Sequence, residues 1–252
     1  MALIEINNVK KKYTSGDDVV EALRGVDITI EAGEFVTIMG QSGSGKSTLL
    51  SVLGGMNHPS EGSVEMAGVK LYGLPGEKLA DFRAANLGFV FQSFHLIPYL
   101  TALENVMLPL AIAKIGKIEK RGMAKEALER VGLGNKSDRL PNQLSGGEQE
   151  RVAIARAIVN NPHILLADEP TGNLDSTTSD EVMGLFRDLN KNGQTVIMVT
   201  HNPDNCVYAD RTIVLKDGRI VAEAEELVAS EICALASVRE MKEFACRGGI
   251  VV

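Results

Sequence analysis

Nine residues in the first fifth of the chain combine glycine, lysine and hydroxyl side chains at a spacing that suits an anion. The run GQSGSGKST extends from Gly40 to Thr48. Its glycines allow the backbone to curl so tightly that successive N–H groups point at one anion. Lys46 adds a mobile positive charge, and the Ser47 hydroxyl suits Mg²⁺. The pattern predicts a loop that binds the phosphates of a nucleotide.

The residues on either side of this run favour that interpretation over an ordinary glycine turn between two core elements. EFVTIM at 34–39 is typical of a buried strand, and STLLSVL after the loop predicts a helix that ends at Gly54 and Gly55. Strand, glycine loop and helix is the order in which a helix N-terminus adds its dipole to an anion site.

A second group of chemical residues stands in HILLADEP, from His163 to Pro170. Four apolar residues predict a buried strand that delivers Asp168 and Glu169 to its end. Adjacent carboxylates there are costly unless a cation or a reaction uses them. Asp168 suits a direct or water-mediated Mg²⁺ contact and Glu169 suits general-base work on a water, with Pro170 predicting an extended backbone at Glu169.

Three single residues stand at the ends of other predicted strands. Gln92 ends NLGFVFQ, and its amide suits a metal-bound water and an attacking water, although such a glutamine is usually unremarkable. His201 ends TVIMVTH and could donate to a γ-phosphate, although a lone histidine is more often structural. Tyr13 ends the first strand-like run. Packing is its commoner role, and the phosphate loop downstream makes stacking on adenine the favoured one.

A further stretch, LSGGEQERVAIARAIVNNP from Leu144 to Pro162, predicts a helix with an unusual start. Ser145 and Glu148 have the spacing of a capping box. Two glycines in the first turn are poor helix formers. They are explained if an anion approaches the backbone closely at this helix N-terminus, whereas the alternative is an ordinary helix start.

The remaining pattern indicates an α/β protein with an antiparallel β-layer over the first forty residues, made of three strand-like runs. Helices are predicted at 114–131 and 177–190, and a hairpin with its turn at Asp217 and Gly218 closes the core. The tail from Glu225 to Val252 carries apolar residues at helical spacing, and its role stays open.

Composition narrows the function classes. The formal net charge of −7 argues against a general nucleic-acid-binding surface. The basic run from Lys114 to Lys125 is interpreted as a solvated helix face rather than a polyanion site. No apolar stretch approaches the roughly 20 residues that span a bilayer, and the N-terminus lacks the features of a signal peptide. We therefore expect a cytoplasmic chain whose membrane role depends on a partner.

With GQSGSGKST, LSGGE, LLADEP, Gln92 and His201 in this order, the chain resembles the nucleotide-binding subunit of an ATP-binding cassette (ABC) transporter over residues 2–222. FVFQSFHLIPYLTALENVMLPL and ADEPTGNLDS resemble its lipoprotein-release and macrolide-export (LolD/MacB-like) branch most. The resemblance implies a P-loop NTPase (RecA-like) α/β core with an N-terminal antiparallel β-layer and an α-helical subdomain inserted at about 93–158. The ATPase domain would span 1–224, and nothing is transferred to the tail at 225–252.

The resemblance also implies a site shared by two copies of the chain, which sandwich two ATP molecules head to tail. In one copy it assigns the nucleotide to Tyr13, Gly40, Gln41, Ser42, Gly43, Ser44, Gly45, Lys46, Ser47 and Thr48, and in the other copy to Ser145, Gly146 and Gly147. It assigns Mg²⁺ to Ser47, Gln92 and Asp168. It assigns catalysis to Glu169, His201, Lys46 and Gln92, with Asp175 at the seam between the copies.

The implied function is Mg-dependent ATP hydrolysis that drives a membrane permease of the lipoprotein-release or macrolide-export type. The chain would be peripheral on the inner face of the plasma membrane, would dimerise on ATP binding, and would bind no nucleic acid. A regulatory ATPase of the cell-division type, which signals through a membrane partner, is the alternative. DNA-repair and translation cassettes fit poorly, because the former need a long coiled-coil insert and the latter carry two cassettes per chain.

Overall fold

The computed structural model describes residues 2–16 and 18–225, so the predicted helical tail lies outside the described residues. The described chain divides into two compact units. Unit 1 contains residues 2–80 and 195–225, and unit 2 contains residues 81–194. Helix α2 (Gly76–Asn86) carries the chain from the first unit into the second.

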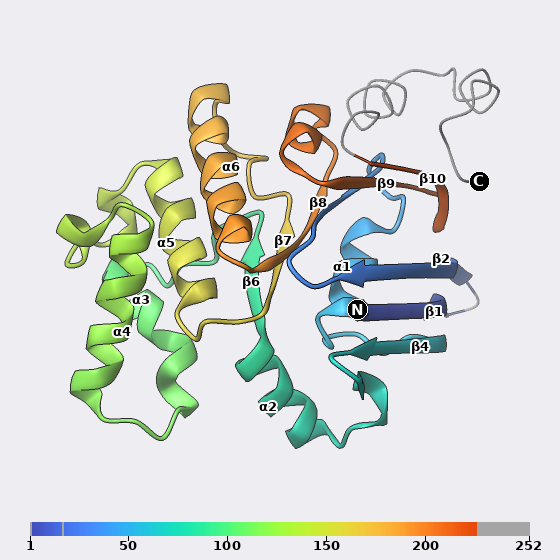
Figure 1. Ribbon diagram of the computed structural model, residues 1–252, viewed down its shortest axis with the longest axis horizontal. Coiled ribbons are helices and arrows are strands. Elements are labelled where there is room, and N and C mark those ends of the chain that lie inside the picture. The colour runs from blue at the N-terminus through green and yellow to red at the C-terminus, as the bar shows by residue number, and fades with distance from the viewer. Residues whose placement is uncertain (1, 17, 226–252) are drawn as a thin grey trace. The chain divides into compact units, whose positions relative to one another are not determined.

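The first layer of unit 1 is an antiparallel sheet in the order β2-β1-β4-β5. Its strands are β1 (Ala2–Ser15), β2 (Asp18–Glu31), β4 (Glu61–Met66) and β5 (Val69–Lys70). Along the second half of β2, buried and exposed residues alternate, as expected for a sheet with one covered face. Figure 1 shows β1, β2 and β4 side by side. The predicted N-terminal antiparallel layer is thus confirmed for its first two runs.

The third run does not belong to that layer. Strand β3 (Phe35–Met39) pairs in parallel with β8 (Thr195–Thr200) and β9 (Arg211–Lys216), and β10 (Arg219–Glu225) pairs antiparallel with β9. The prediction that 34–39 completes the N-terminal layer is wrong. All five residues of β3 are buried, because a continuous apolar strand suits a parallel sheet that is covered on both faces.

Two local predictions in unit 1 are confirmed. Helix α1 (Lys46–Leu53) follows β3 after the glycine loop and stops at Gly54. The β9–β10 hairpin turns at Asp217 and Gly218, whose φ angles of 50° and 75° match the left-handed pair of a type I′ turn.

Unit 2 contains three mutually packed helices, α3 (Ala102–Met107), α4 (Lys117–Arg130) and α5 (Gly146–Ile158) (Figure 1). Their shared core is aliphatic and fully or almost fully buried, with Leu103, Val106, Ala124, Leu128, Val152 and Ile154. The helix predicted at 114–131 is α4, and the one predicted from Ser145 is α5.

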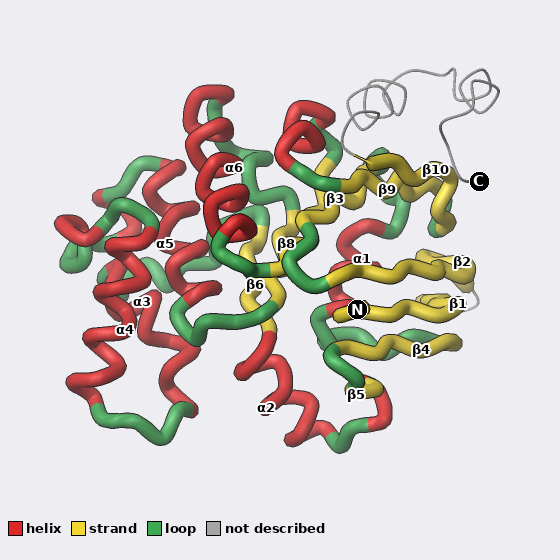
Figure 2. The backbone as a smooth tube through the Cα atoms, in the orientation of Figure 1, coloured by secondary structure: helices red, strands yellow, loops and turns green. Residues whose placement is uncertain are grey.

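Two parallel strands complete unit 2. Strand β6 (Leu87–Phe91) pairs with β7 (Ile164–Asp168), and Phe91 lies opposite Asp168 in the register. Helix α5 packs on β6, and α6 (Ser176–Lys191) packs on α5. Figure 2 shows the loops that join the helices and strands. The described chain also contains 3₁₀ turns at Leu71–Gly73, Leu108–Ile112, Gly134–Lys136, Pro141–Gln143 and Pro203–Tyr208.

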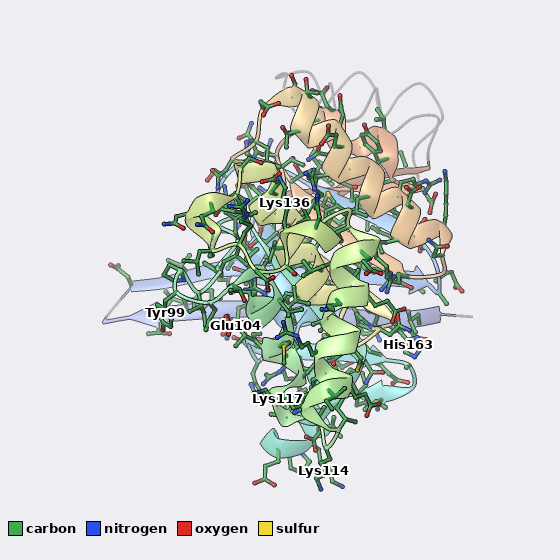
Figure 3. The ribbon with its side chains drawn as sticks, turned by 90° about the vertical axis from the view of Figure 1, so that its left-hand side faces the viewer. Tyr99, Glu104, Lys114, Lys117, Lys136 and His163 are labelled. Atoms are coloured by element: carbon green, nitrogen blue, oxygen red, sulfur yellow. The ribbon has the colours of Figure 1, made fainter. Side chains whose placement is uncertain are left out.

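The basic run has the exposure of a solvated helix face. Lys114, just before α4, and Lys117 and Lys125 of α4 are exposed, whereas Ala124 and Leu128 of α4 are buried. Figure 3 shows Lys114 and Lys117 at one end of the helices of unit 2. Throughout residues 2–16 and 18–225, no helix is both long and apolar enough to cross a membrane.

Candidate nucleotide-binding and catalytic site

The predicted phosphate loop connects β3 to α1 within unit 1. Its backbone needs glycine at two places for different reasons. Gly45 has a φ of 105°, a left-handed value that a side chain disfavours. Gly40 has no room for a side chain, because a Cβ there would lie 2.2 Å from the carbonyl oxygen of Leu215. A Cβ at Gly45 would also lie 2.5 Å from the carbonyl oxygen of Ala22 in β2. The loop is therefore packed between β2 and the β9–β10 hairpin.

Lys46 is the first residue of α1 and is buried. Its ammonium donates to the carbonyl oxygens of Gly40, at 2.7 Å, and Gln41, at 3.0 Å. The charge is thus held above the loop by the loop's own carbonyls. A terminal phosphate offers stronger, charged acceptors, so the ammonium is already placed for an anion at this position.

The hydroxyl side chains of the loop fit a phosphate ligand. Ser44 is 5% exposed, and its hydroxyl has no hydrogen-bond partner among the described residues. A buried hydroxyl without a partner costs roughly 1–3 kcal/mol, and a phosphate oxygen is a strong acceptor. Ser47 is exposed and Thr48 half-buried, while Gln41, Ser42 and Gly43 form the exposed outer edge of the loop.

Tyr13 offers an aromatic surface on the antiparallel layer of unit 1. The side chain is 41% exposed and lies opposite Val20 of β2. Lys11 places its ammonium 5.1 Å from the ring centre, and Asn57 donates to the phenol oxygen at 3.3 Å. The ring is therefore held in place while part of it stays open to a stacking partner.

His201 directly follows β8, and its side chain is exposed. Since β8 is the parallel neighbour of β3, His201 and the phosphate loop both follow carboxyl ends of adjacent strands in unit 1. In open α/β sheets, that edge is where ligands bind.

In unit 2, the paired strands β6 and β7 bring Gln92 and Glu169 together. Each residue directly follows its strand, and the Gln92 amide nitrogen lies 3.3 Å from a carboxylate oxygen of Glu169. Asn173 also donates to the backbone carbonyl of Gln92 at 2.8 Å. The amide nitrogen of Gln92 is engaged by the carboxylate, so its amide oxygen is the end suited to a cation.

The backbone at Glu169 differs from the prediction. Its φ is +46°, in the left-handed region, so the expectation that Pro170 makes it extended is wrong. The next residues explain the difference, because Gly172 donates its N–H to the Glu169 carbonyl at 3.0 Å and closes a tight turn. Left-handed backbone at a non-glycine residue costs about 1 kcal/mol or more and is concentrated at functional sites.

The start of α5 confirms the predicted capping box. The Ser145 hydroxyl accepts from the Glu148 N–H at 3.3 Å, and the Glu148 carboxylate accepts from the Ser145 N–H at 3.0 Å. A hydrogen bond from Lys136, followed by that backbone bond, holds the pKa of Glu148 below its ordinary range. The Ser145 hydroxyl acts here as an acceptor, so its own proton can still be donated to a ligand.

The two glycines of this start have different roles. Gly146 is exposed, and an added Cβ would meet only Leu174, at 3.5 Å. Gly147 is buried, and an added Cβ would lie 2.1 Å from a methyl carbon of Thr178 in α6. Packing within unit 2 is therefore enough to require glycine at Gly147, whereas the role of both glycines toward an anion stays a prediction.

Asp175, which the resemblance places at a dimer seam, also caps α6. Its carboxylate accepts from the Thr178 N–H at 3.0 Å and from the Thr178 hydroxyl at 2.7 Å. The Thr178 backbone bond, followed by the hydroxyl bond, lowers the pKa of Asp175. Asp175 thereby fixes the threonine whose methyl group packs on Gly147.

Several residues of unit 2 that matter for the site gave no sequence signal. Asn173 acts through its hydrogen bond to the carbonyl of Gln92, and Thr178 acts through its packing on Gly147. Both partners are distant along the chain. Glu150, on α5, is completely buried, and neither of its carboxylate oxygens has a hydrogen-bond partner within the described chain. Burial raises its pKa to about 8, against a smaller opposing influence of Arg156.

Residues 23–172, more than half of the chain, match the family described as "ABC transporter". The chain belongs to the ABC transporter family. As such a cassette it binds ATP and hydrolyses it, and the mixed α/β architecture above is the P-loop NTPase fold of that family.

Two relatives, one named for macrolide export and one for lipoprotein release, are similar to this cassette over most of its length. The macrolide export ATP-binding/permease protein MacB of Rhodopirellula baltica is 46% identical over 89% of this chain and 33% of its own length. The lipoprotein-releasing system ATP-binding protein LolD of Geobacter metallireducens is 48% identical over 88% of this chain and 99% of its own. The cassette thus spans about one third of the MacB relative and nearly all of the LolD relative.

The solved structure of another ATP-binding cassette is also similar to this chain. The ATP-binding cassette MJ0796, a dimer in a post-hydrolysis state with ADP and Pi bound, is 45% identical with a TM-score of 0.82. The match covers 88% of this chain and 98% of that one.

Proposed function

We propose that two copies of this chain close around two ATP molecules and that this cycle drives an integral membrane permease. Each nucleotide contacts the phosphate loop at 40–48 of one copy and the start of α5, from Ser145 to Gly147, of the other. The observation that carries the proposal is the exposed start of α5. Gly146 is open, and the capped helix end offers N–H groups and a hydroxyl to an anion. The dimeric state of MJ0796 supports it.

Within each copy, we assign the nucleotide's parts to the chemistry of the side chains. Lys46 and the loop N–H groups hold the β- and γ-phosphates, and Tyr13 stacks on adenine. His201 donates to the γ-phosphate. The order of motifs along the chain and the family membership support this assignment.

The residues also fit a magnesium ion. No group of three or more His, Cys, Asp or Glu gathers as a metal site in residues 2–16 and 18–225. Mg²⁺, however, keeps several waters and takes few protein oxygens, which the Ser47 hydroxyl, the Gln92 amide oxygen and the Asp168 carboxylate supply. When bound, the ion neutralises charge on the phosphates.

Glu169 is the proposed general base. The Gln92 amide nitrogen lies 3.3 Å from one oxygen of the Glu169 carboxylate, and this carboxylate accepts a proton from the attacking water. The backbone of Glu169 is left-handed, and the hydrogen bond from the Gly172 N–H to its carbonyl closes a turn there. This turn, which lies outside any helix or strand, orients the carboxylate.

The membrane partner is proposed from the relatives. The names of the MacB and LolD relatives describe export with a permease and lipoprotein release. We place the cassette on the inner face of the plasma membrane, attached through such a permease, with residues 93–158 as the helical subdomain that faces it. Neither relative's name favours the regulatory alternative.

Replacement of the base tests the proposal. Glu169→Gln keeps the shape of the side chain and removes the base, so turnover should fall about 10²- to 10⁴-fold while ATP affinity changes little. The variant should form a stable dimer on a sizing column only when ATP is present. Glu181→Gln, an exposed carboxylate on α6, is the matched control and should behave as wild type. Normal turnover in Glu169→Gln would refute the general-base role.

A further inference from the structure

The loop that follows β6 adopts a backbone that its own residues disfavour. Phe94 and His95 have φ angles of 57° and 48°, two consecutive non-glycine residues in the left-handed region. Each costs about 1–2 kcal/mol for an L-amino acid. Local contacts include a tilted ring contact between His95 and Phe91, with ring centres 5.1 Å apart, and a turn bond from the Phe94 N–H to the Phe91 carbonyl at 3.1 Å.

A side chain from another element holds this loop. Arg156, in the last turn of α5, donates from one terminal nitrogen to the Phe94 carbonyl at 2.7 Å and from the other to the His95 carbonyl at 2.6 Å. Such charge-assisted bonds are about twice as strong as neutral ones. The fork of the guanidinium matches two adjacent acceptors. Burial lowers the pKa of Arg156. Among the described residues Arg156 forms no ion pair with a carboxylate, and the two loop carbonyls are its hydrogen-bond acceptors.

The two carbonyls lie directly downstream of Gln92. Its own backbone carbonyl is held by Asn173, at 2.8 Å, and its amide by Glu169, at 3.3 Å. Asn173 and Arg156 therefore fix the backbone at the carbonyl of Gln92 and at the carbonyls of Phe94 and His95 that follow it. Arg156 stands on the same helix whose first turn is Ser145 to Gly147, so one rigid element connects the proposed anion-binding turn to the proposed metal-binding glutamine.

We infer that Arg156 is a positioning residue for the reaction. It holds Phe94 and His95 in the left-handed conformation and thereby sets the orientation of Gln92. The inference depends on the role proposed above for Gln92. It predicts that a weakened clamp reduces turnover through Gln92 and leaves nucleotide binding to the phosphate loop unaffected.

The first test is a double-mutant cycle. Arg156→Lys keeps the charge but replaces the planar fork with a single nitrogen on a flexible stem, which weakens the bonds to the two adjacent carbonyls. A displacement of about 1 Å in a catalytic group can cost as much as 100-fold in rate, so we expect kcat to fall about 10- to 100-fold with the Kd for ATP within twofold. In a Gln92→Ala background, Arg156→Lys should change kcat less than twofold, because coupled residues are not additive. Arg151→Lys, on the same helix but paired with Glu181 at 3.1 Å, is the matched control and should leave kcat unchanged.

The second test leaves Arg156 in place. His95 is exposed, so substitutions there should not prevent folding. His95→Gly and His95→Val both remove the ring that contacts Phe91, but only valine resists the left-handed conformation. We expect kcat to fall at least tenfold in His95→Val and less than threefold in His95→Gly.

The outcomes separate this inference from the function on which it depends. If Gln92→Ala leaves kcat unchanged, the role proposed for Gln92 fails and the inference falls with it. If Gln92→Ala lowers kcat but Arg156→Lys lowers it equally in both backgrounds, only the inference is overturned. Equal kcat values for His95→Gly and His95→Val also overturn it, whether or not Arg156→Lys yields folded protein.

Discussion

Glu150 makes the stability of this cassette depend on pH in a predictable direction. Its carboxyl is fully buried without a hydrogen-bond partner among the described residues, and burial raises its pKa from 4.5 to about 8. The folded state therefore binds a proton more tightly than the unfolded state does. The contribution of this group to stability is largest below pH 4.5 and is lost as the pH rises through 8.

The size of the effect follows from the two pKa values. At about 1.4 kcal/mol for each pH unit between them, the folded state loses at most roughly 5 kcal/mol, and about 3 kcal/mol by pH 7. Arg156 opposes the shift, and that influence is already contained in the raised pKa. Glutamine has the shape of glutamate but does not titrate, so the free energy of unfolding of Glu150→Gln should not fall in this way as the pH rises.

Urea unfolding at pH 5, 6, 7 and 8 measures the effect. The free energy of unfolding of Glu150→Gln minus that of wild type should increase steadily over this range. Glu148→Gln is the matched control two residues away, with the opposite sign. Because Lys136 and the Ser145 N–H lower the pKa of Glu148 from 4.5, this variant should be less stable than wild type by an amount that is nearly constant from pH 5 to 8 and shrinks only below about pH 4.5. A constant difference between Glu150→Gln and wild type would show that Glu150 is charged or solvated in the folded protein.

Three further predictions concern the site. Gly147→Ala should cost about 1–3 kcal/mol of stability by overpacking against the Thr178 methyl, and the added change Thr178→Ser, which deletes that methyl, should recover most of it in thermal melts. Lys46→Ala should weaken ATP binding at least about tenfold, because a hydrogen bond to a charged group contributes roughly 1.5–3 kcal/mol; unchanged affinity in titration calorimetry would contradict the phosphate-loop assignment. Tyr13→Ala should weaken ATP by about 1–3 kcal/mol but leave inorganic tripolyphosphate unaffected, and an equal loss for both would remove the stacking role.

Elements set by local pattern could be predicted from the sequence. The glycine loop between β3 and α1, the capping box at Ser145 and the Asp217–Gly218 turn each depend on residues within a few positions of one another. Local hydrogen bonding and φ preferences decide such features, so the sequence states them directly.

Features set by distant contacts could not be predicted. The pairing of β3 with β8 and β9 depends on residues more than 150 positions further along the chain. The reason for Gly147 is a methyl group on α6, and the backbone of Glu169 is set by a turn bond that overrides the preference of a residue before proline. Nothing in the local pattern distinguishes Arg156 from any other arginine in a helix, since its partners are carbonyls about sixty residues earlier.

Mixing two inactive variants tests most directly whether each nucleotide is shared between two copies. Lys46→Ala disables the phosphate loop. Gly146→Asp places a negative charge at the exposed start of α5, where an added Cβ makes an ordinary contact with Leu174 at 3.5 Å. Each variant alone should hydrolyse ATP poorly, because both sites of its dimer are defective.

In a mixed pair, the intact loop of one copy faces the intact helix start of the other, so one site of two is whole. Random pairing then predicts recovery of about one quarter of wild-type turnover in an equimolar mixture, as the symmetry of a two-fold dimer requires. If turnover in the mixture equals the mean of the two variants measured separately at any ratio, each nucleotide is processed within a single chain and the account is contradicted.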